Sequence, residues 1–411
     1  MKYIKRHAEE AVKRMSKLNP AIIVTGPRQV GKTTLLKNLY KDIKFLSFDD
    51  IRIMQYASEN PKQFFNTNPP PVLLDEVQYV PEIFRYIKML ADEKQTAGMF
   101  FMTGSQTFQL MKNATESLAG RVAIIELLGL SLREITNNDF VKPFVPSANY
   151  LSEAKKHIKQ ISHDEIWQII HKGSMPKLYT ADYKQDDWAQ FYTDYVRTYI
   201  EKDVRALLNI GNERAFMLFL RLLAANTGQM INFSKIAAEI GKEVNTVKSW
   251  VSILQNSGII YILEPYFSNI NKRIIKTPKI YFLDTGLCAY LTGWYTAQQL
   301  EFGAMSGSIF ETFIISEIIK SYRNVGANIQ MKFSYYRDKD QKEIDLIIEE
   351  NGTLYPIEIK KTANPNLSDI ANFKVLLNET NKKLGDGCLI YQGDEIVFLK
   401  DTVRAIPVTF L

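Results

Sequence analysis

The chain has 411 residues, of which 46% are hydrophobic and 23% charged, a composition typical of globular rather than disordered proteins. No apolar run reaches the roughly 18 residues that cross a bilayer, and no apolar stretch follows the basic N-terminus, so we expect neither a membrane span nor a secretory signal. Two cysteines argue against a disulfide framework and for a cytoplasmic protein, and a net charge of +6 is compatible with nucleic-acid binding without requiring it.

Five short apolar runs alternate with helical stretches in the first third of the chain. Continuous apolar runs are typical of strands that are buried on both faces of a parallel sheet. The alternation predicts a doubly wound α/β domain over residues 1–135, and the total length predicts two or three domains. The expected strands are Ala21–Thr25, Lys44–Phe48, Val72–Leu74, Met99–Thr103 and Val122–Leu127.

The loop after the first expected strand carries a phosphate-binding pattern, G-x-x-x-x-G-K-[ST]. Its glycines let backbone N–H groups curl around phosphate oxygens, and the helix that follows adds its positive end. Lys32 is expected to reach the β- and γ-phosphates and the Thr33 hydroxyl to bind Mg²⁺, so the predicted cofactors are ATP and Mg²⁺. The predicted nucleotide-binding residues of this loop are Gly26, Pro27, Arg28, Gln29, Val30, Gly31, Lys32, Thr33 and Thr34.

Two later strands also end in polar residues. Ligands of doubly wound folds bind at the carboxyl ends of the strands, where these residues are expected. The third strand ends in Asp75 and Glu76. Asp75 can hold the Mg²⁺ ion, and Glu76 can polarise an attacking water. The fourth strand is followed by Ser105 and Gln106, which could contact the γ-phosphate or the water; a helix N-cap by Ser105 is the alternative.

This order of motifs, completed by Leu118-Ala-Gly-Arg121 before the fifth strand, resembles the AAA superfamily of ATPases over residues 1–135. In that superfamily an arginine at this position commonly enters the site of a neighbouring subunit, where its planar charged fork stabilises the transferring phosphate. The resemblance therefore implies a homo-oligomer in which Arg121 acts in trans. A surface salt bridge is the alternative, and the absence of a clear second sensor arginine departs from ring-forming members.

The resemblance extends past the ATPase domain. Three later features are similar to a large prokaryotic group of such ATPases that carry a C-terminal nuclease-like domain: Gly173-Ser-Met-Pro176, Tyr199-Ile-Glu-Lys-Asp-Val204 and a helix–turn–helix segment. The predicted division is an ATPase domain (1–135), a linker and helical region (136–225), a winged helix (226–300) and a nuclease-like α+β domain of the restriction-endonuclease type (301–411).

Two amphipathic helices, an apolar strand and a basic stretch at 272–276 follow one another, a pattern that resembles a winged helix. If this module binds DNA, Thr246, Lys248 and Ser249 begin the recognition helix and the basic stretch meets phosphates. A packing or protein-contact module is the alternative. The expected elements are the helices Phe233–Gly241 and Val244–Asn256 and the strand Ile259–Leu263.

A two-residue Asn351-Gly352 turn between alternating apolar runs predicts a hairpin near the C-terminus. Counting outward from this turn sets Asp345 opposite Glu358, with Lys360 on the same face as Glu358. Facing carboxylates repel each other, and a divalent cation that bridges them would remove that cost. The hairpin therefore predicts a metal site.

The same residues resemble the PD-(D/E)xK nuclease superfamily, although its proline-aspartate pair is absent. The resemblance implies that Glu311, Asp345 and Glu358 hold Mg²⁺ and that Lys360 orients or activates the attacking water. Pro356 lacks an N–H group and restricts its strand to a sheet edge or a strand start. An inactive nuclease-like scaffold is therefore the alternative.

Together these motifs predict an ATP-driven enzyme that handles nucleic acid, with DNA as a possible partner, through a Mg²⁺-dependent nuclease-like domain. The alternative function is a nucleotide-gated regulatory switch whose C-terminal domain is an inactive, partner-binding scaffold. The four histidines have no metal-ligand spacing, and we interpret them as solvated residues.

Overall fold

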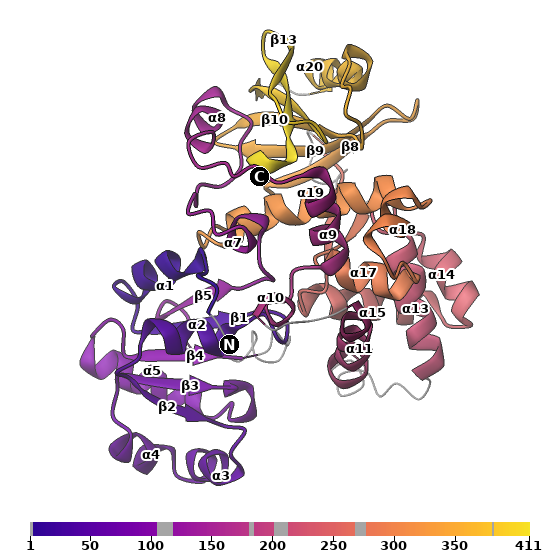
Figure 1. Ribbon diagram of the computed structural model, residues 1–411. Coiled ribbons are helices and arrows are strands. Elements are labelled where there is room, and N and C mark those ends of the chain that lie inside the picture. Colours follow the sequence, from indigo (N-terminus) through magenta and orange to yellow (C-terminus); the bar gives the residue numbers. More distant parts are fainter. Residues whose placement is uncertain (1–2, 105–117, 181–184, 201–212, 268–276, 380–381) are drawn as a thin grey trace.

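The computed structural model describes residues 3–104, 118–180, 185–200, 213–267, 277–379 and 382–411. The basic stretch at 272–276, the predicted site residues Ser105 and Gln106 and most of the motif at 199–204 lie outside the described residues. Figure 1 shows a sheet domain at each end of the molecule and a mostly helical region beside them, with helix α19 (Ser306–Arg323) between the two sheets.

The N-terminal domain is a parallel sheet with helices on both faces. Its elements are α1 (Ala8–Ser16), β1 (Ala21–Thr25), α2 (Lys32–Leu39), β2 (Lys44–Ser47), α3 (Ile51–Glu59), α4 (Pro61–Thr67), β3 (Val72–Asp75), α5 (Ile83–Lys94), β4 (Phe100–Thr103) and β5 (Val122–Glu126). The strands lie in the order β2-β3-β4-β1-β5. All five predicted strands are confirmed, with ends that differ by at most one residue. Ile22 and Val24 of β1 pack with α1 and α2, whereas Ala21 and Ile23 pack with α3, α4 and α5.

The middle of the chain is mostly helical. Its helices are α7 (Leu132–Ile135), α8 (Ala148–Ala154), α9 (His163–Lys172), α10 (Lys177–Thr180), α11 (Gln185–Tyr195), the π-helical turn η2 (Val196–Ile200), α13 (Glu213–Ala225), α14 (Phe233–Ile240), α15 (Val244–Asn256), α17 (Thr285–Thr292) and α18 (Ala297–Phe302). The predicted helix–turn–helix corresponds to α14 and α15, and Gly241 ends α14 in the left-handed conformation. Strands β6 (Ile260–Leu263) and β7 (Lys279–Phe282) then pair as an antiparallel hairpin.

The solvated interpretation of the histidines is wrong for two of them. His7 and His171 are both buried, and each ring is placed by a hydrogen bond between Nε2 and a backbone carbonyl oxygen, of Asn138 at 2.8 Å and of Trp294 at 3.0 Å. Burial lowers the pKa of both rings, so the neutral forms are favoured inside the protein.

The C-terminal domain is a mixed sheet in the order β13-β14-β12-β10-β9-β8, with β11 paired to β10. The elements after α19 are β8 (Phe333–Arg337), β9 (Glu343–Glu350), β10 (Thr353–Ile359), the 3-10 helix η3 (Leu367–Val375), α20 (Leu376–Glu379), β11 (Lys383–Leu384), β12 (Gly387–Tyr391), β13 (Val397–Lys400) and β14 (Val403–Pro407). Thr353 pairs with Glu350 and Ile357 with Leu346, which confirms the predicted register.

The expectation that Pro356 restricts its strand to a sheet edge or a strand start is wrong. Strand β10 is interior, with β9 on one side and both β11 and β12 on the other. The pairing with β11 ends at Leu354 and the pairing with β12 begins at Ile357, so Pro356 lies in the interval between the two partners. A missing N–H group costs no ladder hydrogen bond at that position.

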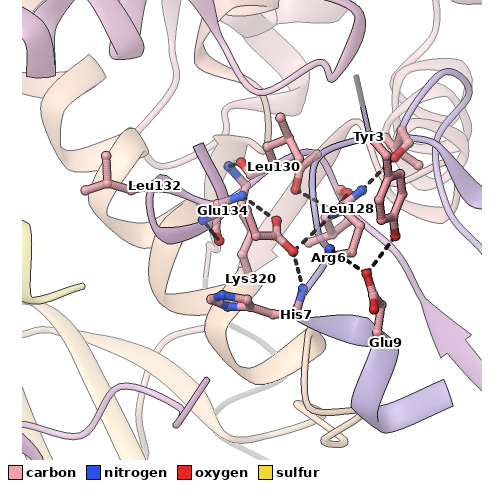
Figure 2. A network of polar contacts seen from close by, with 12 residues as sticks. Tyr3, Arg6, His7, Glu9, Leu128, Leu130, Leu132, Glu134 and Lys320 are labelled. Carbon is pink, nitrogen blue, oxygen red and sulfur yellow. Dashed lines mark hydrogen bonds and ion pairs between the residues drawn. The ribbon is translucent and has the colours of Figure 1, made fainter. Parts of the chain in front are cut away.

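Residues 128–134, which we call the hub segment, follow β5 and contact all three parts of the chain. Arg6 forms a buried ion pair with Glu134 (Nε–Oε1 3.1 Å) and donates to the carbonyl oxygen of Val30 in the phosphate loop (2.7 Å). Figure 2 shows Glu134 between Arg6 and the backbone N–H of His7, which also donates to it. Burial alone would raise the pKa of Glu134, but these partners hold it below its ordinary value.

Helix α19 and the helical region contact the hub segment from the other sides. Lys320 donates to the carbonyl oxygen of Leu130 (3.0 Å) and pairs with Glu317 (2.8 Å), which accepts a hydrogen bond from the N–H of Leu132 (2.7 Å). The N–H of Leu130 donates to the carbonyl oxygen of Ser174, at 2.7 Å. The hub segment thus contacts the N-terminal residues, the helical region and α19 at once.

We expect Glu134→Gln to lower the free energy of unfolding by about 3–5 kcal/mol, because the substitution leaves the buried Arg6 guanidinium without its counter-charge. Urea unfolding followed by tryptophan fluorescence measures this loss in the first transition. Glu10→Gln, which removes the exposed partner of Lys13 (3.0 Å), is the matched control and should leave the midpoint unchanged. A loss for Glu134→Gln as small as that of the control would contradict the prediction.

Candidate functional site

The carboxyl ends of three neighbouring strands bring predicted site residues together. The Thr33 hydroxyl, on the first turn of α2, donates to the Asp75 carboxylate at the end of β3 (2.7 Å). The buried Thr103 hydroxyl at the end of β4 donates to the same oxygen of Asp75. A hydroxyl and a carboxylate in contact are the donor set that a P-loop offers to Mg²⁺, so these residues fit the predicted ion.

The phosphate loop is folded around its own lysine. The Lys32 ammonium donates to the carbonyl oxygens of Gly26 (3.0 Å) and Pro27 (2.8 Å), within the concavity that the loop encloses. Gly26 has a φ of +140°, and a Cβ there would lie 2.0 Å from the carbonyl oxygen of Leu127, so only glycine fits. Phosphate oxygens are stronger acceptors than these carbonyls, so the loop is suited to exchange them for a nucleotide.

Glu76 follows Asp75 in a left-handed conformation (φ +56°), which turns the chain sharply after the strand. The side-chain amide of Gln78 donates to its carboxylate. Glu76 and the loop line the same cavity.

A cavity of about 540 Å³ extends from the phosphate loop. Besides Asp49 and Glu76, four segments distant in sequence line it: the N-terminal residues, the phosphate loop, the hub segment and the region of helix α10. Sequence reasoning identified the loop and Glu76 but missed the N-terminal residues, the hub segment and α10. The only local signal was Gly173-Ser-Met-Pro176, which precedes α10 and was noted for its resemblance alone. The lining residues missed by the sequence are Tyr3, Ile4, Arg6, Asp49, Leu130, Pro176, Lys177 and Thr180.

Arg121 lies at the amino ends of the strands, opposite the end that carries the phosphate loop. Its carbonyl oxygen accepts from the N–H of Ala21 at the start of β1, whereas the phosphate loop follows Thr25 at the end of that strand. The four steps along β1 cover about 13 Å. Within the chain Arg121 pairs with Asp92 on α5, as the salt-bridge alternative expects. Its guanidinium therefore cannot serve the nucleotide cavity of its own chain.

Residues 18–136 match the family described as AAA domain, over the sheet and the strand ends described above. The N-terminal domain is an AAA-type P-loop ATPase domain. Two further matches cover most of the remaining chain, at residues 163–298 and 306–411, and both families are described as domains of unknown function (DUF8612 and DUF4143). The AAA match thus supports nucleotide binding by the N-terminal domain, and the descriptions of the two other families give no function.

Proteins similar to this chain over most of its length come from bacteria and archaea. An uncharacterized protein of Mycobacterium tuberculosis is 28% identical over 413 residues, with 98% of this chain and 83% of that protein covered. An uncharacterized protein of Methanocaldococcus jannaschii is 22% identical over 386 residues, with 89% and 77% covered.

Two solved structures were compared with the fold. The Walker-type ATPase of Pyrococcus abyssi has a TM-score of 0.42 and 14% identity, covering 70% of this chain and 96% of that one. AMPPCP-bound DnaA from Aquifex aeolicus has a TM-score of 0.28 and 13% identity, covering 60% and 85%.

Four carboxylates gather in the C-terminal domain: Glu311 of α19, Glu343 and Asp345 of β9, and Glu358 of β10. We call them the carboxylate cluster. Asp345 and Glu358 are 7% and 5% exposed, and Asp345 accepts a hydrogen bond from the N–H of Ile359 (2.8 Å). Burial, reinforced by Glu311 and Glu358, raises the pKa of Asp345.

Two lysines accompany the carboxylate cluster. Lys360, which was predicted, pairs with Glu358 (2.7 Å), and burial raises the pKa of that carboxyl to about 7 despite the lysine. Lys279 of β7, which was not predicted, pairs with Glu311 (3.2 Å) and Glu343 (2.5 Å). Burial alone would lower the pKa of Lys279, but its acidic neighbours raise it, so the ammonium stays charged.

The carboxylate cluster does not fit the predicted Mg²⁺ ion as it stands. Among the residues that the structure describes, no three histidine, cysteine, aspartate or glutamate side chains are placed to hold a metal ion. Glu311, Asp345 and Glu358 share a region of the domain, but Glu311 is engaged by Lys279 and by the hydroxyl of Tyr281 (2.6 Å). We therefore derive no metal chemistry for this domain.

The candidate DNA-facing residues begin helix α15. Lys248 and Ser249 are exposed and Thr246 is half-buried, so these residues are accessible in the chain.

Within the described part of the chain, no helix combines the length and apolar character that a membrane crossing needs.

We expect Lys32→Ala to weaken Mg²⁺–ATP binding by about 10–100-fold, because the variant loses a charge-assisted contact to the phosphates. Isothermal titration with ATP and Mg²⁺ measures the change. Lys37→Ala, an exposed lysine on the same helix, is the matched control and should bind as the wild type does. Equal affinity in Lys32→Ala and Lys37→Ala would remove Lys32 from the site.

Proposed function

We propose that the chain is a nucleotide-gated regulatory switch that binds and hydrolyses ATP in its AAA domain. The observation that carries this proposal is the contact between Thr33 and Asp75 at the mouth of the loop that holds Lys32, with Glu76 on the same cavity. Lys32 binds the β- and γ-phosphates, and Glu76 orients the attacking water and accepts its proton. Mg²⁺, held by Thr33 and Asp75, supplies neutralising charge when bound.

The switch is gated by the contacts that surround the cavity. Lys177 and Thr180 of the helical region line the cavity beside the phosphate loop. Arg6 also lines it and joins the loop to the hub segment. A nucleotide that displaces the Lys32 ammonium from the carbonyls of the loop alters the positions of these groups, and the hub segment carries that change to α19.

The C-terminal domain serves as a partner-binding scaffold in this proposal. The positive charge of Lys279 among its carboxylates favours a scaffold over a Mg²⁺-dependent nuclease. Nucleic-acid handling is the second candidate function, favoured by the accessible Lys248 and Ser249 at the start of α15. DNA that stimulates ATP hydrolysis, or that is cleaved with Mg²⁺, would favour the second candidate.

We expect Glu76→Gln to keep ATP binding and to reduce hydrolysis by about 10²–10⁴-fold, because the amide keeps the shape of the side chain but cannot accept a proton. Steady-state phosphate release measures hydrolysis, and titration with ATP measures binding. Hydrolysis at the wild-type rate would contradict the role of Glu76.

The same variant tests the gating. With ATP bound and not hydrolysed, amide hydrogen exchange should change in residues 128–134 and 306–323, because the hub segment and α19 respond to the loop. Lys32→Ala is the control and should show no ATP-dependent change. If ATP did not change the hydrogen exchange of Glu76→Gln, the chain would be an ATPase but not a switch.

Arg121 acts in trans in this proposal, so ATP hydrolysis needs a homo-oligomer. Mixing Arg121→Ala with Glu76→Gln should restore part of the activity, because some interfaces then combine an intact Glu76 with an intact Arg121 of the neighbour. A mixture of Lys32→Ala and Glu76→Gln is the control and should stay inactive, since both defects lie in the chain's own site. If both mixtures co-assemble and both stay inactive, the result would contradict the role of Arg121 in the site of a neighbouring subunit.

A further inference from the structure

The carboxylate cluster holds more negative charge than its surroundings tolerate without compensation. Glu311, Glu343, Asp345 and Glu358 belong to α19 and to two strands of the same sheet, and Asp345 and Glu358 are nearly inaccessible to water. Buried carboxylates require a counter-charge or hydrogen-bond donors. In a metal-dependent domain a divalent cation supplies that charge.

Lys360 of the domain pairs with Glu358, and the second counter-charge comes from a lysine outside the domain. Lys279 belongs to the β6–β7 hairpin, within the region matched by the preceding family, and its side chain is 4% exposed. Its backbone is fixed by pairing with Leu263 and by a bridge to Met230 on the other side. The ammonium is therefore held in the cluster by the fold of the preceding region.

Several of the oxygens that a cation would need already accept from groups of the chain. Glu311 Oε1 accepts from Lys279 and from the hydroxyl of Tyr281. Glu343 pairs with Lys279 and also with Arg337 (2.9 Å). Among the described buried side-chain atoms, Glu358 Oε2 is the oxygen of this cluster without a hydrogen-bond partner.

A divalent cation in the cluster would therefore meet a fixed positive charge, and among the described residues no three acidic side chains are placed to hold it. Mg²⁺ takes six ligands in near-ideal octahedral geometry, and an ammonium beside the carboxylates repels it and occupies oxygens that it would need. The same ammonium pairs with Glu311 and Glu343, and the hydroxyl of Tyr281 also donates to Glu311.

We propose that Lys279 is the resident cation of the C-terminal domain and takes the place of a divalent metal ion, so that the carboxylate cluster is a metal-independent joint between the β6–β7 hairpin and the C-terminal sheet. The proposal goes beyond the switch function and does not depend on ATP binding. It makes the carboxylate cluster structural, and it predicts that metal binding appears only when the lysine charge is removed.

The first test compares Mn²⁺ binding by the wild type and by Asp345→Asn, both full-length, in calorimetric titrations with Mn²⁺ alone. Any binding at the phosphate loop is common to both chains and cancels. We expect the same isotherm, because Asp345 holds no metal in the wild type. An affinity that falls by about 10–100-fold in Asp345→Asn, as loss of a metal-site residue produces, would overturn the proposal.

The second test removes the resident charge. Lys279→Met should acquire an Mn²⁺ site and a melting temperature that rises with Mn²⁺, and both should disappear in Lys279→Met/Asp345→Asn. Lys332→Met, which removes the partner of Glu350 elsewhere in the same sheet (2.5 Å), is the matched control and should acquire neither. A folded Lys279→Met that binds no more Mn²⁺ than Lys332→Met would overturn the proposal. If Lys279→Met does not fold, the comparison of the wild type with Asp345→Asn decides.

Discussion

The buried ion pair between Arg6 and Glu134 anchors the hub segment, which the helical region and α19 contact from the other sides. A guanidinium without water must have a counter-charge and an acceptor for each of its donors, and Arg6 finds them in Glu134 and in the carbonyl oxygens of Val30 and Leu128. Val30 belongs to the phosphate loop, whereas Leu128 and Glu134 belong to the hub segment. The Arg6 guanidinium thus links the N-terminus to both of these parts of the AAA domain.

The candidate nucleotide site combines strand ends of a common fold with cavity walls that other segments of this chain supply. The AAA sheet supplies the strand ends that carry Thr33, Asp75 and Glu76, a geometry that any doubly wound sheet offers. The walls of the cavity come from elsewhere, from the N-terminal residues and from helix α10. Helix α10 follows Ser174, whose N–H and hydroxyl both donate to Asp284 at the start of α17 (2.7 Å each). Hydrogen bonds therefore connect one wall of the cavity to the helical region.

In the C-terminal domain, too, charges removed from water need partners, and here lysines pair with carboxylates. Its four carboxylates are partly removed from water, and the chain compensates them with Lys279 and Lys360. Internal ammonium groups thus supply positive charge to the carboxylates of this sheet. The compensation also joins two regions, since Lys279 belongs to the hairpin and Glu311 to α19, and it resembles the way in which Arg6 joins the N-terminus to the hub segment.

The sequence by itself determined the features that depend on neighbours along the chain. The five strands, the phosphate loop and the hairpin register that sets Asp345 opposite Glu358 follow from apolar runs, glycine positions and an Asn-Gly turn. The tertiary structure alone decided the pairing of Arg6 with Glu134, 128 residues away, and the entry of Lys279 into the carboxylate cluster. A charged residue in a sequence is expected to be solvated, and only packing determines which charges lose their water and must therefore find a partner.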